Sequence, residues 1–120
     1  MFELTIDARF SAAHAIRING RPEPTHGHDW VATVCIAGET LDKNDLLMDF
    51  HTIEDALKDC VARFHNRFMN EVAPFNDINP TAERVAEHIG KTIQPILVGD
   101  ITLLWTRVTE APGCAAIWRP

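Results

Sequence analysis

The chain has 120 residues, a formal net charge of −6 and 46% hydrophobic residues. This length and composition are ordinary for a soluble globular protein, so we expect a single domain over residues 1–120. An acidic chain without a basic run argues against nucleic acid as the main partner, although one basic pocket for a small phosphorylated substrate is compatible with this charge.

Segment 2–10 alternates apolar and charged or polar residues, with the even positions apolar. This period of two predicts a half-buried strand. A loop that contains Gly20, Pro22 and Pro24 follows it. The next apolar stretch predicts a second strand over about residues 28–38.

Segment 49–68 changes to helical spacing, and Asp49 is a suitable N-cap for a helix that begins there. Segment 79–97 has the same spacing. Its start, Asn79-Pro80, is typical of an N-cap followed by proline at the first helical position. The sequence therefore predicts two amphipathic helices in the middle of the chain.

Two further strands are predicted over about residues 101–110 and 114–119, with a turn at Pro112-Gly113 between them. The predicted order of elements is ββααββ. This order indicates the α+β class, with a four-stranded antiparallel sheet that carries two helices on one face.

The three cysteines, Cys35, Cys60 and Cys114, are widely spaced and form no C-x-x-C pair. Neither a disulfide framework nor a cysteine zinc site is indicated, and a reducing compartment fits best. The charged first ten residues are neither a signal peptide nor a spanning helix. We therefore expect a cytoplasmic protein with no membrane partner.

Three histidines are candidates for metal ligands. His26 and His28 are two residues apart at the start of the second strand, so both imidazoles can point to one ion. Gly27 between them lets another group approach closely, and His14 comes alongside if the first two strands pair. Three neutral histidines leave a tetrahedral zinc ion one open position, as in catalytic sites. From this pattern alone, an alternative stays open: two loop histidines and one buried, hydrogen-bonded histidine.

Five short motifs follow one another at plausible spacing: residues 10–14 (FSAAH), 26–28 (HGH), 48–50 (MDF), 70–75 (NEVAPF) and 79–83 (NPTAE). Together they closely resemble the 6-pyruvoyltetrahydropterin synthase family, which includes bacterial 6-carboxytetrahydropterin synthases of queuosine biosynthesis. The resemblance covers nearly the whole chain.

The resemblance implies a tunnelling fold whose subunits join edge to edge into a barrel, commonly as trimers paired into hexamers. It implies a homo-oligomer with an active site between subunits, and zinc held by His14, His26 and His28. Closing a barrel across subunits also removes the exposed edges of an open sheet.

The resemblance also assigns roles to residues near the ends of the predicted elements. Glu110, in Thr109-Glu110, aligns with a glutamate that binds the pterin ring, and a carboxylate can accept two bonds from the ring's planar donors. His65 aligns with the family's catalytic histidine. The alternatives are an exposed glutamate at a strand end and a histidine that caps the first helix.

Two positions depart from the family pattern. The usual cysteine base before H-G-H is absent, since no cysteine precedes Cys35. Glu23 instead forms the E-x-x-H-G-H pattern of a type III branch, in which a glutamate is the base and the side chain is cleaved to a 6-hydroxymethyl product of folate biosynthesis. Its alternative is a solvated loop residue. Phe64 stands where the family usually has an aspartate that orients the histidine.

These observations predict a zinc-dependent lyase that acts on 7,8-dihydroneopterin triphosphate or a close relative. Its expected catalytic residues are Glu23, His65 and Glu110, with Thr109 and Glu110 binding the substrate. The product is a 6-carboxy, 6-pyruvoyl or 6-hydroxymethyl pterin. The alternative is a non-catalytic, zinc-containing module that binds a pterin or purine.

Overall fold

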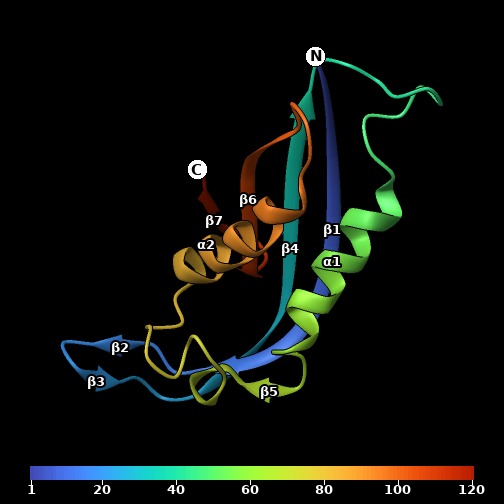
Figure 1. The fold of residues 1–120 in the computed structure, drawn as a ribbon. Helices are drawn as coiled ribbons and strands as arrows, with labels where there is room; N and C mark the ends of the chain where they lie inside the picture. The colour runs from blue at the N-terminus through green and yellow to red at the C-terminus, as the bar shows by residue number, and fades with distance from the viewer.

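A twisted sheet of four long antiparallel strands dominates the computed structural model, which describes residues 1–120 (Figure 1). The sheet order is β5-β1-β4-β6-β7. The long strands are β1 (Phe2–His14), β4 (His26–Gly38), β6 (Thr102–Ala111) and β7 (Cys114–Trp118). The predicted α+β class and the ββααββ order of the long elements are confirmed.

The fifth strand, β5 (Arg67–Phe68), lies parallel to β1 at one edge of the sheet. Two residues are too few to produce a recognisable alternation of apolar and polar residues. For that reason the sequence did not predict this strand.

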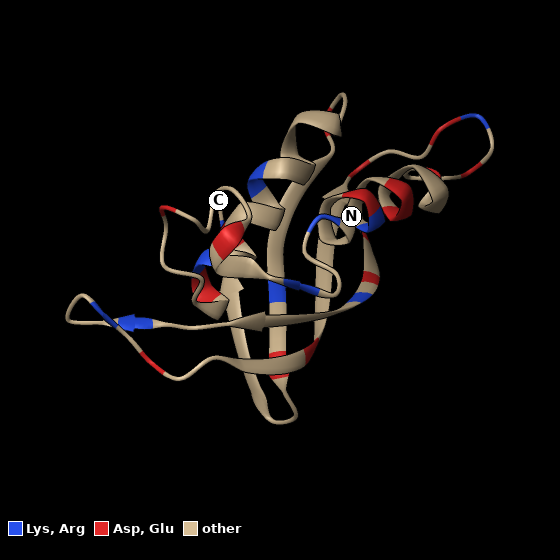
Figure 2. Cartoon of the chain, turned by 90° about the horizontal axis from the view of Figure 1, so that it is seen from below, with Lys and Arg blue, Asp and Glu red and all other residues tan.

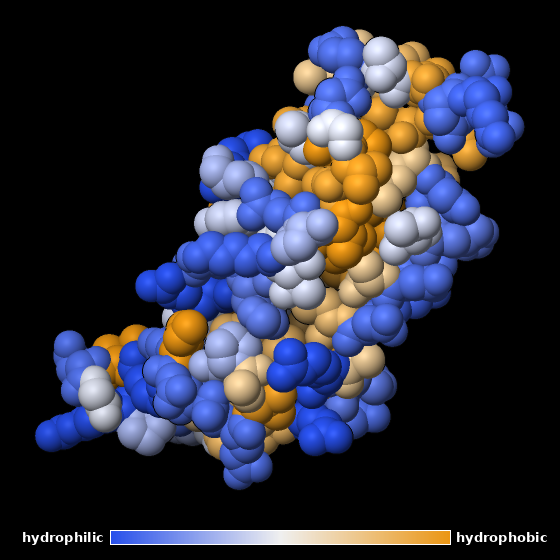
Figure 3. Space-filling model, viewed as in Figure 1, coloured by the Kyte–Doolittle hydropathy of each residue, from blue (hydrophilic) through white to orange (hydrophobic).

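Two helices, α1 (Phe50–Ala62) and α2 (Ala82–Ile93), cover one face of the sheet. Both carry charged residues (Figure 2), while their buried side chains pack on the even-numbered residues of β1 and β4. The buried side chains of the helices are Ile53, Leu57, Cys60, Val61, Val85, Ala86, Ile89 and Ile93. A band of apolar atoms is visible between the two helices (Figure 3).

The observed helix ends differ from the predicted ones. α1 begins after Asp49, as predicted, because the Asp49 carboxylate accepts a hydrogen bond from the backbone N–H of His51 at 2.9 Å. It ends at Ala62 rather than continuing to residue 68, since Asn66 has a positive φ of 57° that an α-helix does not allow.

The N-cap of α2 is Thr81, so the prediction of an Asn79-Pro80 cap was wrong. The Thr81 hydroxyl accepts a hydrogen bond from the backbone N–H of Arg84 at 3.2 Å. The Asn79 side chain instead bonds the backbone N–H and C=O of Arg17, at 2.8 and 2.9 Å. A side chain engaged with another segment cannot also cap the helix.

The segment between β1 and β4 forms a small hairpin of β2 (Arg17–Ile18) and β3 (Arg21–Pro22). Its turn is Asn19-Gly20, and both residues have positive φ, at 53° and 77°. This is the backbone of a two-residue hairpin loop, for which Asn-Gly is the preferred sequence. The hairpin lies where the sequence predicted only a loop. No helix of the structure is long and apolar enough to cross a membrane.

Candidate metal centre

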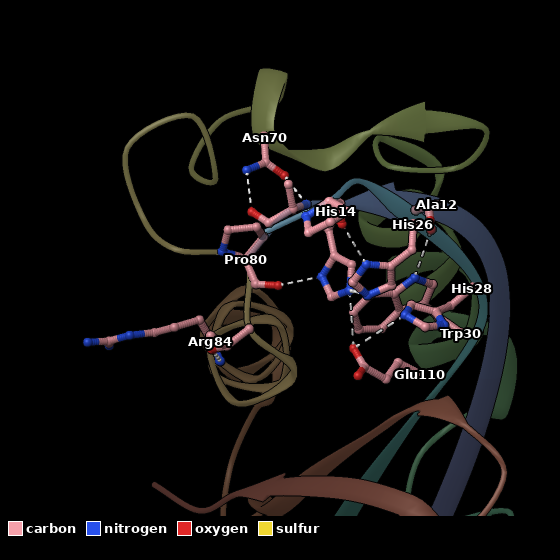
Figure 4. A network of polar contacts seen from close by, with 12 residues as sticks. Ala12, His14, His26, His28, Trp30, Asn70, Pro80, Arg84 and Glu110 are labelled. Atoms are coloured by element: carbon pink, nitrogen blue, oxygen red, sulfur yellow. Dashed lines mark hydrogen bonds and ion pairs between the residues drawn. The ribbon is translucent and has the colours of Figure 1, made fainter. Parts of the chain in front are cut away.

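The pairing of β1 with β4 brings the three histidines together. In this ladder His14 lies opposite His26, and Ala12 lies opposite His28. Because side chains two residues apart on a strand share a face, all three imidazoles project to the same side. Figure 4 shows them pointing toward one another.

The three ligand atoms all lie within 4.8 Å of one another. The Nε2 atoms of His14 and His26 are only 3.1 Å apart. His14 is fully buried, whereas the His28 side chain is 20% exposed. The predicted cluster is therefore present, with one buried member and two that reach the surface.

Hydrogen bonds fix the protonation of two of the rings. His14 Nδ1 donates to the carbonyl oxygen of Pro80 at 2.8 Å, and His26 Nδ1 donates to that of Pro24 at 3.0 Å. A carbonyl oxygen only accepts, so in each neutral ring Nε2 carries the lone pair. Burial lowers the pKa of His14, which keeps this ring neutral near pH 7. With both rings neutral, two lone pairs face each other across 3.1 Å.

Glu110 adds a fourth acceptor to the cluster. It lies at a β-bulge, because Thr109 and Ala111 pair with β7 and Glu110 does not. Its Oε2 is 3.3 Å from His14 Nε2 and 4.0 Å from His28 Nε2. Both Glu110 Oε2 and His28 Nε2 are buried without a hydrogen-bond partner. Buried polar atoms of native proteins rarely lack a partner.

A divalent cation fits this group of residues. Imidazole nitrogens and a carboxylate oxygen converge from several sides, and two of these atoms, His28 Nε2 and Glu110 Oε2, are buried without a hydrogen-bond partner. Imidazole nitrogen and carboxylate oxygen are ordinary ligands of zinc. The Pro80 carbonyl behind His14 supplies the kind of outer-shell bond that orients a ligating histidine.

Two asparagines hold the chain just after His14. Asn70 accepts a hydrogen bond from the backbone N–H of Ala15 and donates to its carbonyl, at 2.9 and 2.8 Å. Asn79 bonds Arg17 in the same way. In the sequence, both asparagines were noted only as parts of motifs. The structure explains their presence in those motifs, because their paired hydrogen bonds to the backbone fix the position at which β1 ends.

His65 lies apart from the histidine cluster, in the turn between α1 and β5. Its Nδ1 accepts a hydrogen bond from the backbone N–H of Ser11 at 3.1 Å. The neutral ring therefore carries its proton on Nε2. Phe64 is fully buried between Phe75 and His88, with ring centroids 5.3 and 5.7 Å away. The backbone of β1 thus orients His65, and Phe64 belongs to the core.

Shallow depressions connect Glu110 with His65 across the end of the sheet. One is lined by His28, Thr109 and Glu110, the next by His28 and Ser11, and the third by Ser11 and His65. Asp29 lines all three, and its Oδ1 accepts a hydrogen bond from the Ser11 hydroxyl at 2.6 Å. Ser11 and Asp29 were missed at the sequence level, because neither belongs to a ligand or base pattern.

Glu23 lies in the segment between β3 and β4 and is exposed. Its backbone N–H donates to the carbonyl oxygen of Ile16 at 2.8 Å. Its carboxylate forms no hydrogen bond or ion pair with the histidines. The Glu23 side chain therefore lies outside the histidine cluster, although Glu23 is only three residues before His26 in the chain.

These features define an α+β domain with a candidate three-histidine metal centre at one end of its sheet. A model of the family described as 6-pyruvoyl tetrahydropterin synthase matches residues 3–120. The chain belongs to this family, whose enzymes are lyases of pterin metabolism.

Curated relatives agree with this assignment. The 6-carboxy-5,6,7,8-tetrahydropterin synthase of Bacillus subtilis (strain 168) is 27% identical over 128 residues, which cover 99% of this chain and 86% of the relative. A putative 6-carboxy-5,6,7,8-tetrahydropterin synthase of Archaeoglobus fulgidus is 31% identical over 84 residues, 70% of this chain and 69% of that protein.

Solved structures show the same fold. The 6-pyruvoyl tetrahydropterin synthase of Caenorhabditis elegans has a TM-score of 0.86 at 17% identity, covering 99% of this chain and 95% of that one. A Plasmodium vivax 6-pyruvoyltetrahydropterin synthase with a catalytic residue mutated has a TM-score of 0.79 at 16% identity, covering 99% and 97%. The predicted tunnelling fold is confirmed.

Proposed function

We propose that this chain is a zinc-dependent lyase that acts on the side chain of 7,8-dihydroneopterin triphosphate. The observation that carries the proposal is the convergence of His14, His26 and His28, whose ligand atoms lie within 4.8 Å of one another. Family membership supplies the substrate class, since the Bacillus relative is a tetrahydropterin synthase.

In this proposal His14, His26 and His28 hold the zinc ion. When bound, zinc supplies a Lewis acid beside the hydroxyl groups of the pterin side chain. Glu110 and Thr109 bind the pterin ring, and both line the depression that also contains His28. The shared depression supports this assignment, because the proposed ring-binding carboxylate and His28 line the same surface.

Two residues would handle protons. Glu23 is proposed as the base that takes a proton from the side chain, because no cysteine precedes the H-G-H motif. In the Plasmodium vivax protein the catalytic residue replaced is also a glutamate. His65 is proposed to donate from Nε2, the nitrogen left protonated by the Ser11 bond.

Arg9 supports a phosphorylated substrate. It lines the depression with Glu110 and also the one with His65, so a cation borders both ends of the proposed site. Arg67 borders the adjoining depression. A polyphosphate is stabilised by such side chains even on a chain with a net charge of −6.

We also propose that the active form is a homo-oligomer, a trimer or hexamer, with the site at the contact between subunits. The five-residue β7 and the two-residue β5 leave unpaired edges on the sheet. Edge-to-edge joining would satisfy them. The proposed depressions are shallow in one subunit, and a neighbour would deepen them.

The second candidate is a non-catalytic module that binds a pterin or purine with its metal. Phe64, where the family usually has an aspartate, and the missing cysteine favour it. The Ser11 bond to His65 weighs against it, since this histidine is oriented without the aspartate.

The test is incubation of zinc-loaded protein with 7,8-dihydroneopterin triphosphate, followed by mass analysis of the pterin. We expect a 6-carboxy or 6-pyruvoyl product, or a 6-hydroxymethyl product from side-chain cleavage. The mass distinguishes these outcomes. Unchanged substrate, with pterin binding intact, would contradict the lyase and leave the binding module.

A further inference from the structure

A depression beyond His65 is bordered by positive charges and by no negative charge. It lies between α1 and β1, and the charged residues that line it are Arg9, Lys58 and Arg67, with His65 on its border. No aspartate or glutamate lines it. On a chain with a net charge of −6, a depression lined by cations alone favours an anionic ligand. We call it the cationic depression.

The three cations come from different elements and are available to a ligand. Arg9 projects from β1, Lys58 from α1 and Arg67 from β5, which pairs with β1. Neither arginine forms an ion pair within the chain. Lys58 pairs with Glu54 at 3.1 Å, but these side chains are 60% and 39% exposed, and such surface pairs contribute little. A bound anion can therefore engage all three cations.

The cationic depression continues the proposed active site. It shares Arg9 and His65 with the neighbouring depression. Asp29 and Glu110 border the other depressions of the site, and neither borders this one. The charge of the lining therefore changes, from carboxylates near Glu110 to cations alone beyond His65. A ligand with hydrogen-bond donors on a ring at one end and phosphate at the other matches this change.

We infer that the cationic depression binds the triphosphate tail of the substrate and makes the site selective for a phosphorylated pterin. The inference rests on the proposed function, because the tail reaches beyond His65 only if the ring is bound at Glu110. Guanidinium and ammonium groups donate charge-assisted hydrogen bonds to phosphate oxygens, and a guanidinium can do so with two N–H groups at once. A tail held in this way would fix the side-chain carbons beside His65.

Lys58 is the residue that separates tail binding from ring binding. Arg9 and Arg67 also border depressions that contain the proposed metal ligand His28, whereas Lys58 borders neither of these. Replacing Lys58 should therefore weaken the binding of a phosphorylated pterin and leave the binding of an unphosphorylated one unchanged.

The test compares neopterin with neopterin triphosphate on zinc-loaded protein, with both dissociation constants measured by pterin fluorescence. These oxidised pterins keep the 2-amino group, the adjacent ring N–H and the side chain of the dihydro substrate. The wild type should bind the triphosphate at least about tenfold more tightly, the effect of one charge-assisted hydrogen bond. Lys58→Ala should lower this preference about threefold, as expected for an exposed charge. The double variant Lys58→Ala/Arg67→Ala should remove most of it.

Lys91→Ala is the matched control. Lys91 is 62% exposed and pairs with Glu87 four residues away, as Lys58 pairs with Glu54, but it lies on α2 outside the depressions of the site. This variant should keep the wild-type preference. In the wild type the preference should shrink between about 0.1 M and about 1 M salt, where the Debye length falls from about 10 Å to about 3 Å.

The failure of this inference and the failure of the proposed function give different results. If neopterin binds but the wild type, Lys58→Ala and the double variant share one preference for the triphosphate, the tail site is overturned and the proposed function stands. A wild type without any preference has the same meaning. No neopterin binding by the wild type, or unchanged neopterin affinity in Glu110→Gln, would overturn the proposed pterin site itself.

Discussion

The Nε2 atoms of His14 and His26 lie 3.1 Å apart, and the carbonyls of Pro80 and Pro24 hold the only proton of each neutral ring on the opposite nitrogen. Each carbonyl bond fixes a ring orientation as well as a tautomer. With both rings neutral, this contact is repulsive without a cation and attractive with one, so metal content and stability should be interdependent.

Zinc should raise the free energy of unfolding of the wild-type chain. At free zinc of about 100 times its dissociation constant the gain is about 2.7 kcal/mol, provided that the unfolded chain binds zinc poorly. His26→Ala and His28→Ala should lose most of this gain, because each variant keeps only two of the three imidazole ligands. Thermal unfolding with zinc and with chelator measures it. Equal zinc-induced shifts of the unfolding temperature in the wild type and both variants would contradict the proposed metal site.

Replacing the proposed base should remove turnover and spare binding. Glu23→Ala should lower the rate by about a hundred- to ten-thousand-fold, the usual contribution of a positioned general base. Zinc content and pterin affinity should stay at wild-type values, since the Glu23 carboxylate contacts no histidine. Glu39→Ala, an exposed glutamate that pairs with the N-terminus, is the control. Wild-type turnover in Glu23→Ala would redirect attention to His65.

A side chain at position 27 should obstruct the site without harming the fold. A Cβ built on Gly27 meets nothing within 4 Å, and Gly27 lines the depressions beside His28. The free energy of unfolding of Gly27→Val should lie within about 1 kcal/mol of the wild-type value, because β-branched residues suit strands. The KM for the pterin substrate should rise several-fold. An unchanged KM would place the substrate elsewhere.

Stability should fall on the acid side partly through His88. Burial against Phe64 and Phe75, and then the charge of Arg63, lower the pKa of His88 below 6.5. The unfolded chain therefore takes up a proton near pH 6.5 that the folded chain does not, and the free energy of unfolding decreases as pH falls below that value. Urea unfolding of His88→Gln should show a shallower decrease between pH 6.5 and 5. If the free energies of unfolding of the wild type and His88→Gln decreased in parallel with pH, the role of His88 would be contradicted.

Much of this architecture was predictable from local patterns. The alternation of residues 2–10 identified β1, and Asp49 marked the start of α1. The Asn19-Gly20 pair is also a local hairpin signal, which goes beyond the loop predicted for this segment. These features can be predicted from the sequence because each depends only on residues that are close together in the chain.

The parts that were not predictable depend on distant segments. Phe64 continues the apolar spacing of α1 although the helix has already ended at Ala62, since a buried turn also needs apolar residues. The bond from Ser11 to His65 joins residues 54 positions apart. The approach of Glu110 to His14 depends on a bulge, which no pattern of polarity reveals.

Anomalous X-ray diffraction at the zinc absorption edge would show whether His14, His26 and His28 together hold one metal ion. Crystals of zinc-loaded protein, grown without pterin, should give one strong peak per chain, about 2.0–2.1 Å from Nε2 of His14, His26 and His28. Zinc-loaded crystals with no peak among these atoms would rule out the three-histidine site.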